Sequence, residues 1–353
     1  MGAVAAHILR STITLSHAIH IDGSPTCFVQ AGGDTVLRAA LRAGLGFPYE
    51  CNSGGCGTCK FDIVGGEVHV LWPEAPGLTE RDRRKGRQLA CQCVATGELA
   101  IKVRTDPEYV PRILPRRHRA RLIATADVTH DIREFRFATE NAAEFLAGQY
   151  ASLVIGGVDA PRAYSMSNLP NEQGEWHFQI RKVHQGQATT RLFHALQIGD
   201  EVEIDGPYGL AYLREDNPRD IVCIAGGSGL APMVSITRAA AAAGLLGTRK
   251  LHFFYGGRTP SDLCGEPFLQ ELAGFGDAIV YHCVVSDGAS AKAIDWSGNV
   301  GFVHEWLPRL LGGDLARHEF YFAGPPPMTQ AIQEMLMVTH RVPFQQIHFD
   351  RFF

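Results

Sequence analysis

Alternating apolar and polar positions are most regular in the middle of the chain, between residues 118 and 216. Phe135 and Phe137 alternate with charged residues, and Trp176 and Phe178 show the same period of two. This period predicts short strands with one buried face, and several such strands separated by turns indicate a small antiparallel β-barrel.

The C-terminal stretch, residues 217–353, shows near-continuous apolar runs instead of alternation. Runs of this kind, separated by helical segments, predict a parallel sheet covered by helices on both faces. The runs occupy residues 221–225, 251–255, 279–285 and 320–323.

The N-terminal stretch begins with alternating strands at 12–20 and 26–30, followed by a short helix that we expect to start at an Asp34 N-cap. This compact pattern is typical of a β-grasp domain. Three prolines between residues 105 and 117 exclude a regular helix or a central strand there, so this segment is interpreted as a linker.

These patterns together predict a multidomain fold that combines α+β and α/β parts. The expected parts are a β-grasp domain over residues 1–104, a linker over 105–117, a β-barrel over 118–216 and a parallel α/β domain over 217–353.

Composition narrows the class of protein. The 353 residues are 45% apolar with a net charge of −4, which gives no global attraction to nucleic acid or to an anionic membrane. No apolar run approaches the roughly 18 residues of a membrane span. We therefore expect a soluble cytoplasmic enzyme with no membrane or nucleic-acid partner.

The cysteines carry the strongest chemical signal. Cys51, Cys56 and Cys59 form a C-x4-C-x2-C loop, and Cys91 follows at a distance. This is the ligand spacing of a plant-type [2Fe–2S] cluster. A zinc site usually needs paired C-x2-C knuckles, and only one such pair is present. Spacing alone does not decide whether Cys91 or Cys93 is the fourth ligand.

A second signal lies within the predicted barrel. Arg162, Tyr164 and Ser165 place a cation, an aromatic ring and a hydroxyl on one strand, which suits the phosphate, ring and reactive nitrogen of a flavin. Gly186 and Thr189 form a glycine turn with hydrogen-bond donors, typical of a pyrophosphate site. The alternative is that Arg162 is a solvated residue and Tyr164 part of the core.

A third signal is a glycine-rich turn between an apolar strand and a helix, where a dinucleotide's pyrophosphate can approach the helix N-terminus. A second element, Gly324-Pro325, follows another strand of the predicted sheet and opens a helix. We expect Met335 and Met337 of that helix to pack in the core. The glycine-rich turn comprises Gly226, Gly227, Ser228 and Gly229.

With these motifs in this order, the chain resembles the ferredoxin–NAD(P)H reductase family with an N-terminal plant-type [2Fe–2S] ferredoxin domain. More narrowly, it is similar to the reductase components of soluble bacterial di-iron monooxygenases, such as those of the toluene 4-monooxygenase type. The stretches that carry the likeness are 47–56, 89–93, 206–210, 226–234 and 347–353.

The resemblance implies roles for particular residues. It makes Cys91 the fourth cluster ligand and assigns Arg162, Tyr164, Ser165, Gly186 and Thr189 to FAD. Ser165 and Tyr164 are then the catalytic pair, with the serine near flavin N5 and the tyrosine beside the ring. Phe353 joins the cofactor-binding residues. Relatives usually carry Cys where this chain has Ala323, which affects the rate of hydride transfer rather than the reaction.

The implied function is electron transfer from NADH through FAD and the [2Fe–2S] cluster to a Rieske ferredoxin or directly to a di-iron hydroxylase. Asp287 follows a strand where a carboxylate would repel the 2′-phosphate of NADPH, while Arg258 opposes that argument. The basic segment 81–87 either docks an acidic partner or is a solvated surface. Alternatives are the reductase of a Rieske-type dioxygenase and a non-enzymatic redox sensor.

Overall fold

The computed structural model of the protein describes residues 16–351. The chain divides into two compact units at Val110 and Pro111, within the predicted linker. Each unit is described by itself. Among the described residues, none of the helices combines the length and the apolar character that crossing a bilayer requires.

The first unit is built on a five-stranded sheet in the order β2-β1-β7-β3-β5, in which β1 and β7 are parallel and the other pairs antiparallel. Strands β4 and β6 form a separate small sheet. The helices are α1 (Val36–Arg42) and α2 (Glu80–Arg84). The strands are β1 (His17–Ile21), β2 (Cys27–Gln30), β3 (Lys60–Gly65), β4 (Val68–Val70), β5 (Gln88–Leu89), β6 (Cys93–Ala95) and β7 (Leu99–Lys102).

The expected Asp34 N-cap is wrong by one residue. Thr35 is the N-cap of α1, and its hydroxyl accepts a hydrogen bond from the Arg38 N–H at 3.3 Å. Asp34 instead forms an ion pair with Arg42, with 3.0 Å between the carboxylate oxygen and the guanidinium nitrogen. The arginine competes for the carboxylate, and the neighbouring hydroxyl takes over the cap.

The first part of the second unit is an antiparallel sheet in the order β11-β10-β13-β8-β9-β12. A bridge between Met166 and Phe178 joins its two ends, so the sheet is a nearly closed barrel, as the alternation predicted. Phe135, Phe137 and Trp176 are fully buried in its core. The elements are β8 (Arg116–Asp127), β9 (Ile132–Thr139), β10 (Tyr150–Val154), β11 (Arg162–Ser165), β12 (Glu175–Arg181), α3 (Gln187–His194) and β13 (Glu201–Tyr208).

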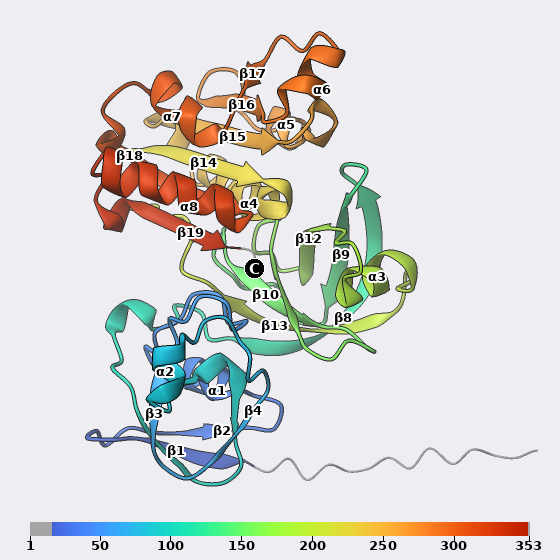
Figure 1. Cartoon of the computed structure of the whole chain (residues 1–353). Coiled ribbons are helices and arrows are strands. Elements are labelled where there is room, and N and C mark those ends of the chain that lie inside the picture. Colours follow the sequence, from blue (N-terminus) through green and yellow to red (C-terminus); the bar gives the residue numbers. More distant parts are fainter. Residues whose placement is uncertain (1–15, 352–353) are drawn as a thin grey trace, which may run out of the picture. The chain divides into compact units, whose positions relative to one another are not determined.

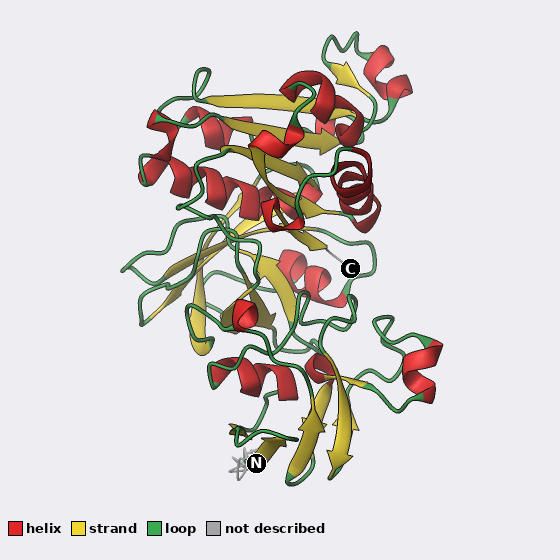
Figure 2. Cartoon of the chain, turned by 90° about the vertical axis from the view of Figure 1, so that its left-hand side faces the viewer, coloured by secondary structure: helices red, strands yellow, loops and turns green. Residues whose placement is uncertain are grey.

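The second part is a parallel sheet in the order β17-β16-β15-β14-β18-β19, which confirms the prediction from the apolar runs. Helices cover both of its faces (Figures 1 and 2), each over a separate apolar core. The strands are β14 (Asp220–Gly226), β15 (Leu251–Gly257), β16 (Ile279–Val285), β17 (Asn299–Val300), β18 (His318–Gly324) and β19 (Ile347–Arg351). The helices are α4 (Leu230–Ala242), α5 (Glu266–Gln270), α6 (Gly288–Ala293), α7 (Val303–Leu311) and α8 (Pro326–Glu334).

The expected burial of two methionines after α8 is confirmed only in part. Met335 is buried, whereas Met337 is 37% exposed. The chain leaves α-helical geometry after Glu334 and forms a π-helical turn over Met335–Thr339. Met337 follows Met335 by two residues, about 200° of helical rotation, and so lies on the opposite side of the helix from the core.

Candidate functional site

The four cysteines of the C-x4-C-x2-C pattern come together as two pairs of thiols in the first unit. The side chains of Cys51 and Cys56 lie close enough to perturb each other's pKa, and those of Cys59 and Cys91 do as well. Two irons bridged by sulfide take two thiolates each. The two pairs of thiols therefore fit the two irons of a binuclear cluster.

The thiols perturb one another strongly. Hydrogen bonds, the largest of them with Cys56, lower the pKa of Cys51 to about 5. The pKa of Cys56 is raised by its contact with Cys51, and that of Cys91 by its contact with Cys59 and by burial. Thiolates this close repel one another, and bound iron removes that repulsion.

The Cys93 side chain lies beside Gln88 and is not grouped with the other thiols. It is fully buried, burial raises its pKa to about 12, and its Sγ lies 3.9 Å from Gln88 Oε1. Cys91, by contrast, contacts Cys59 and accepts a hydrogen bond from the Gln92 amide at 3.7 Å. The structure therefore groups Cys91, and not Cys93, with the three thiols of the loop.

The cysteine loop is held by backbone contacts that need glycine. Gly57 has φ +76°, and a Cβ there would lie 2.3 Å from the carbonyl oxygen of Gly77. Gly54 has φ +91° and accepts a hydrogen bond from the Gly77 N–H at 2.9 Å. These contacts fix the loop under the segment around Gly77.

The predicted flavin residues lie on β11, an end strand of the barrel sheet. Arg162 is exposed, and among the described residues its guanidinium donates only to the carbonyl oxygens of Ala160 and Pro161. Tyr164 is half-buried against the barrel core, and burial raises its pKa to about 12. Because side chains alternate along a strand, Arg162 and Tyr164 share one face.

Ser165 presents a buried hydroxyl that is suited to bind a ligand. Its side chain is 5% exposed, and its hydroxyl has no hydrogen-bond partner among the described residues. A buried hydroxyl without a partner costs about 1–3 kcal/mol. The residues of β11 therefore fit a flavin that supplies this partner.

Gly186 and Thr189 use their hydrogen-bonding groups within the neighbouring loop of the protein. The Thr189 hydroxyl accepts from the Val183 N–H at 3.2 Å and contacts the carbonyl oxygens of Val183 and Gly186 at 3.3 Å. Gly186 is the N-cap of α3. The hydroxyl holds the 183–186 loop in place at the start of the helix.

We expect Thr189→Ala to weaken FAD binding about tenfold, because the loop loses its internal hydrogen bonds while the barrel core stays intact. The dissociation constant is measured by the fluorescence of released flavin. Thr189→Ser keeps the hydroxyl and serves as the matched control. Equal affinities in the alanine and serine variants would refute a role for the hydroxyl.

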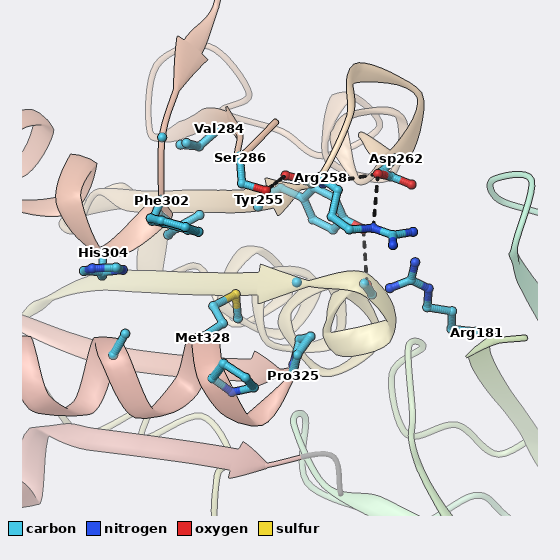
Figure 3. A pocket seen from close by; sticks show the side chains of 18 of the residues that line it. Arg181, Tyr255, Arg258, Asp262, Val284, Ser286, Phe302, His304, Pro325 and Met328 are labelled. Carbon is cyan, nitrogen blue, oxygen red and sulfur yellow. Dashed lines mark hydrogen bonds and ion pairs between the residues drawn. The ribbon is translucent and has the colours of Figure 1, made fainter. Parts of the chain in front are cut away.

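A pocket of about 540 Å³ opens at the carboxyl ends of the parallel strands (Figure 3). Gly226 ends β14 and Gly227 follows it, Gly256 and Gly257 end β15, and Pro325 follows β18. Small residues at this edge let a dinucleotide's pyrophosphate approach the backbone. Three of the predicted residues, Gly226, Gly227 and Pro325, are thus brought together.

Two arginines that line the pocket are paired with carboxylates. Arg181 comes from β12 of the barrel, and its Nε lies 2.6 Å from Asp131 Oδ2. Arg258 follows β15, and its Nε lies 3.9 Å from Asp262 Oδ2. Arg181 has no local sequence signal, because it is one polar position in an alternating strand. Arg258 is detectable, since it directly follows an apolar strand.

Aromatic side chains form another part of the pocket wall. Tyr255 donates a hydrogen bond to the Gly227 carbonyl oxygen at 3.3 Å. Phe302, 59% exposed, stacks on His304 with the rings 5.8 Å apart and 18° from parallel. The exposure of Phe302 could not be deduced from its apolar neighbours in the sequence.

Four other predicted residues do not line the pocket. Gly229 packs against β18, where a Cβ would lie 2.0 Å from the Ala323 carbonyl oxygen. A Cβ at Gly324 would meet the Met328 methyl group at 2.7 Å. Asp287 is the N-cap of α6 and accepts from the Ala289 N–H at 3.0 Å. The fourth is Ser228, and the predicted Phe353 lies outside the described residues.

Comparison with known sequences matches a family model to each of the three parts of the chain: the cysteine-loop domain, the barrel and the parallel-sheet domain. Residues 19–96 match the 2Fe-2S iron-sulfur cluster binding domain, 119–212 the oxidoreductase FAD-binding domain and 223–334 the oxidoreductase NAD-binding domain. The chain is 40% identical to the ferredoxin–NAD(P)+ reductase CarAd of Metapseudomonas resinovorans, over 91% of this chain and 95% of the relative. The protein belongs to the ferredoxin–NAD(P)H reductase family.

Other members of this family confirm the assignment. The ferredoxin–NAD+ reductase component of the alkene monooxygenase system of Xanthobacter autotrophicus is also 40% identical, over 90% of this chain and 95% of the relative. A solved structure, the ferredoxin reductase in carbazole 1,9a-dioxygenase, superposes with a TM-score of 0.87 at 36% identity and covers 96% of this chain and 99% of that one. The protein is therefore an NAD(P)H-dependent oxidoreductase that uses FAD and a [2Fe–2S] cluster.

Proposed function

We propose that this ferredoxin–NAD(P)H reductase oxidises NADH and delivers single electrons to a small ferredoxin of a bacterial oxygenase system. The observation that carries the proposal is the composition of the 540 Å³ pocket, which is lined by residues of both the parallel sheet and the barrel. A nucleotide bound at the sheet therefore extends to the barrel that carries the flavin residues. NADH is a cytoplasmic reductant, which supports a cytoplasmic location.

The residues that hold NADH are those of the pocket. Gly226 and Gly227 leave the backbone open to the pyrophosphate, and Arg181, oriented by Asp131, supplies a positive charge beside it. Phe302 offers an exposed ring face for the adenine. These contacts orient the nucleotide and exclude water from it.

The residues that hold FAD are on and around β11. With FAD bound, Arg162 would be available to its phosphates, Tyr164 would pack against it, and the Ser165 hydroxyl, which has no partner among the described residues, would donate a hydrogen bond to it. Gly186 and Thr189 set the loop at the start of α3. When bound, FAD exchanges a two-electron hydride for single electrons, which the cluster held by Cys51, Cys56, Cys59 and Cys91 carries onward.

The immediate acceptor that we propose is a Rieske-type ferredoxin. Its support is that the two relatives at 40% identity are both named ferredoxin reductases. Relatives at about 30% identity are named as the reductase component of phenol 2-monooxygenase and the electron transfer component of xylene/toluene monooxygenase, which supports a di-iron monooxygenase hydroxylase as the terminal partner. The similarity to the ferredoxin reductase in carbazole 1,9a-dioxygenase supports the alternative of a Rieske-type dioxygenase.

The function is tested by anaerobic titration of the purified holoprotein with NADH, followed by visible absorption. Bleaching of both flavin and cluster bands, with about three electrons taken up per protein, is the expected result for one flavin and one cluster. If neither NADH nor NADPH bleaches the bands, the reductase function is refuted and a redox sensor becomes the better interpretation.

Asp287 provides a test of nucleotide preference. We expect Asp287→Asn to raise kcat/KM for NADPH about tenfold, because the charge that repels the 2′-phosphate is removed. Asparagine keeps an oxygen that accepts from the Ala289 N–H, so α6 stays capped. Steady-state kinetics with both nucleotides is the measurement, and Asp314→Asn, which removes an exposed carboxylate that does not line the pocket, is the matched charge control. An unchanged NADPH rate would exclude Asp287 as the determinant.

A further inference from the structure

A large aromatic side chain lies exposed against the cysteine loop of the first unit. Trp72 is 44% exposed, and its neighbour Leu71 is 51% exposed. A Cβ at Gly54 would lie 3.2 Å from the Trp72 Cε3 atom, so the indole packs directly on the loop between Cys51 and Cys56. One side of the indole thus touches the cluster loop while the rest of it is open to solvent.

The backbone around Trp72 is held in place at several points. The Leu71 N–H donates a hydrogen bond to the Gln92 carbonyl oxygen at 2.8 Å. The Gly77 N–H donates a hydrogen bond to the Gly54 carbonyl oxygen. Arg83 of α2 donates to the carbonyl oxygens of Pro73 and Ala75. Exposure of Trp72 is therefore a property of a fixed segment that α2 supports.

Helix α2 is itself anchored by a buried carboxylate. Asp82 forms a capping box with Thr79 and lies 2.8 Å from Lys60 Nζ and 3.2 Å from Arg87 Nη1. Hydrogen bonds, the largest with Lys60 and the next with Thr79, lower the pKa of Asp82 well below its usual value. Arg83 and Arg87 are thus used in holding the helix and the Trp72 segment.

The remaining basic side chains of this segment face solvent. Arg81, Arg84 and Lys85 are exposed, and within the described part of the chain none has an ion-pair partner. The exposed acidic residues nearby are Glu74 and Glu80. Residues 79–87 carry five basic and two acidic side chains, a local charge of +3 in a protein whose net charge is −4.

We propose that Leu71, Trp72, Arg81, Arg84 and Lys85, here called the Trp72 surface, form the docking site for a small acidic ferredoxin; this rests on the proposed function. An exposed tryptophan on a segment that Arg83 of α2 holds, with exposed cations on and next to the same helix, has the composition of an interface hot spot. The cations attract an acidic partner that the negative charge of the whole protein would otherwise repel. The apolar centre then seats the partner over the cluster loop.

The first test measures reduction of a purified small acidic Rieske-type ferredoxin by the NADH-reduced holoprotein. We expect Trp72→Ala to lower kcat/KM for the ferredoxin about tenfold and Trp72→Phe to keep most of it. Val29→Ala, which removes another exposed apolar side chain of the same unit, is the control. Ferricyanide reduction, visible absorption and the electron paramagnetic resonance signal of the reduced cluster verify that the cofactors are intact.

The second test separates charge from apolar contact. The triple variant Arg81→Ala/Arg84→Ala/Lys85→Ala should lose about tenfold in kcat/KM at low salt and become nearly insensitive to salt. With cytochrome c, a basic acceptor, the same variant should not lose rate. Arg121→Ala/Arg317→Ala, two exposed cations of the other unit, is the charge control. Calorimetric titration of the oxidised proteins should show weaker ferredoxin binding in both the Trp72→Ala and the triple variants.

The outcomes distinguish the docking site from the function. Wild-type protein that reduces ferricyanide but not the ferredoxin would overturn the proposed acceptor, and the docking site with it. A wild-type protein that reduces the ferredoxin, with unchanged kinetics and affinity in the Trp72→Ala and triple variants, would overturn the docking site alone. Loss of the cluster signal in Trp72→Ala would show that the indole stabilises the loop, and retained ferredoxin affinity in that variant would then overturn docking.

Discussion

Cys91→Ser is expected to eliminate the [2Fe–2S] absorption and the reduction of one-electron protein acceptors while leaving NADH-dependent ferricyanide reduction by the flavin. The reason is that Cys91 pairs with Cys59, so one iron loses half of its thiolate ligands. Visible absorption, iron content and the electron paramagnetic resonance signal of the dithionite-reduced protein measure the loss.

Cys93→Ser is the matched control, two residues along the chain. Its side chain is fully buried beside Gln88 Oε1, which can accept a hydrogen bond from the introduced hydroxyl. We expect normal cluster content and a modest change in stability. If the cluster were lost in Cys93→Ser and kept in Cys91→Ser, the grouping of the thiols in the structure would be contradicted.

Ser165→Ala is expected to slow hydride transfer from NADH about 10²-fold without destabilising the fold. A single donor aimed at a reacting group contributes on this scale. The Ser165 hydroxyl has no partner in the described structure, so removing it leaves no other buried group unsatisfied. Stopped-flow flavin reduction measures the rate, and thermal unfolding of the flavin-free protein measures stability.

Ser165→Thr keeps a hydroxyl and suits a β-strand, so it should recover a large part of the rate. Equal loss of rate in the alanine and threonine variants would show that the size of the side chain, and not its hydroxyl, is what matters. A large drop in the melting temperature of the flavin-free alanine variant would assign Ser165 a structural role instead.

The sequence by itself determined the architecture and the kinds of cofactor. Alternation at Phe135 and Phe137 predicted the barrel, and continuous apolar runs such as 221–225 predicted the parallel sheet. Both signals are periodic, and burial on one or two faces of a sheet directly imposes that period. The spacing of the loop cysteines predicted the cluster, because one tight loop must supply three ligands.

The sequence did not show which of two neighbouring side chains caps a helix or where a helix changes its geometry. Asp34 and Thr35 are both good N-caps, and only the approach of Arg42 to Asp34 decides between them. The π-helical turn over Met335–Thr339 likewise has no signal in the residue pattern. In each case the outcome depends on side chains or backbone hydrogen bonds that the local pattern does not specify.

Only the tertiary structure decided which residues share a site. Arg181 reaches the nucleotide pocket from a barrel strand, and Trp72 covers a cysteine loop that lies well before it in the chain. Cys91 and Cys93 are equivalent by spacing, and their surroundings separate them. Periodicity records which face of an element is buried, whereas the identity of its neighbours follows from how strands and loops from distant parts of the sequence pack together.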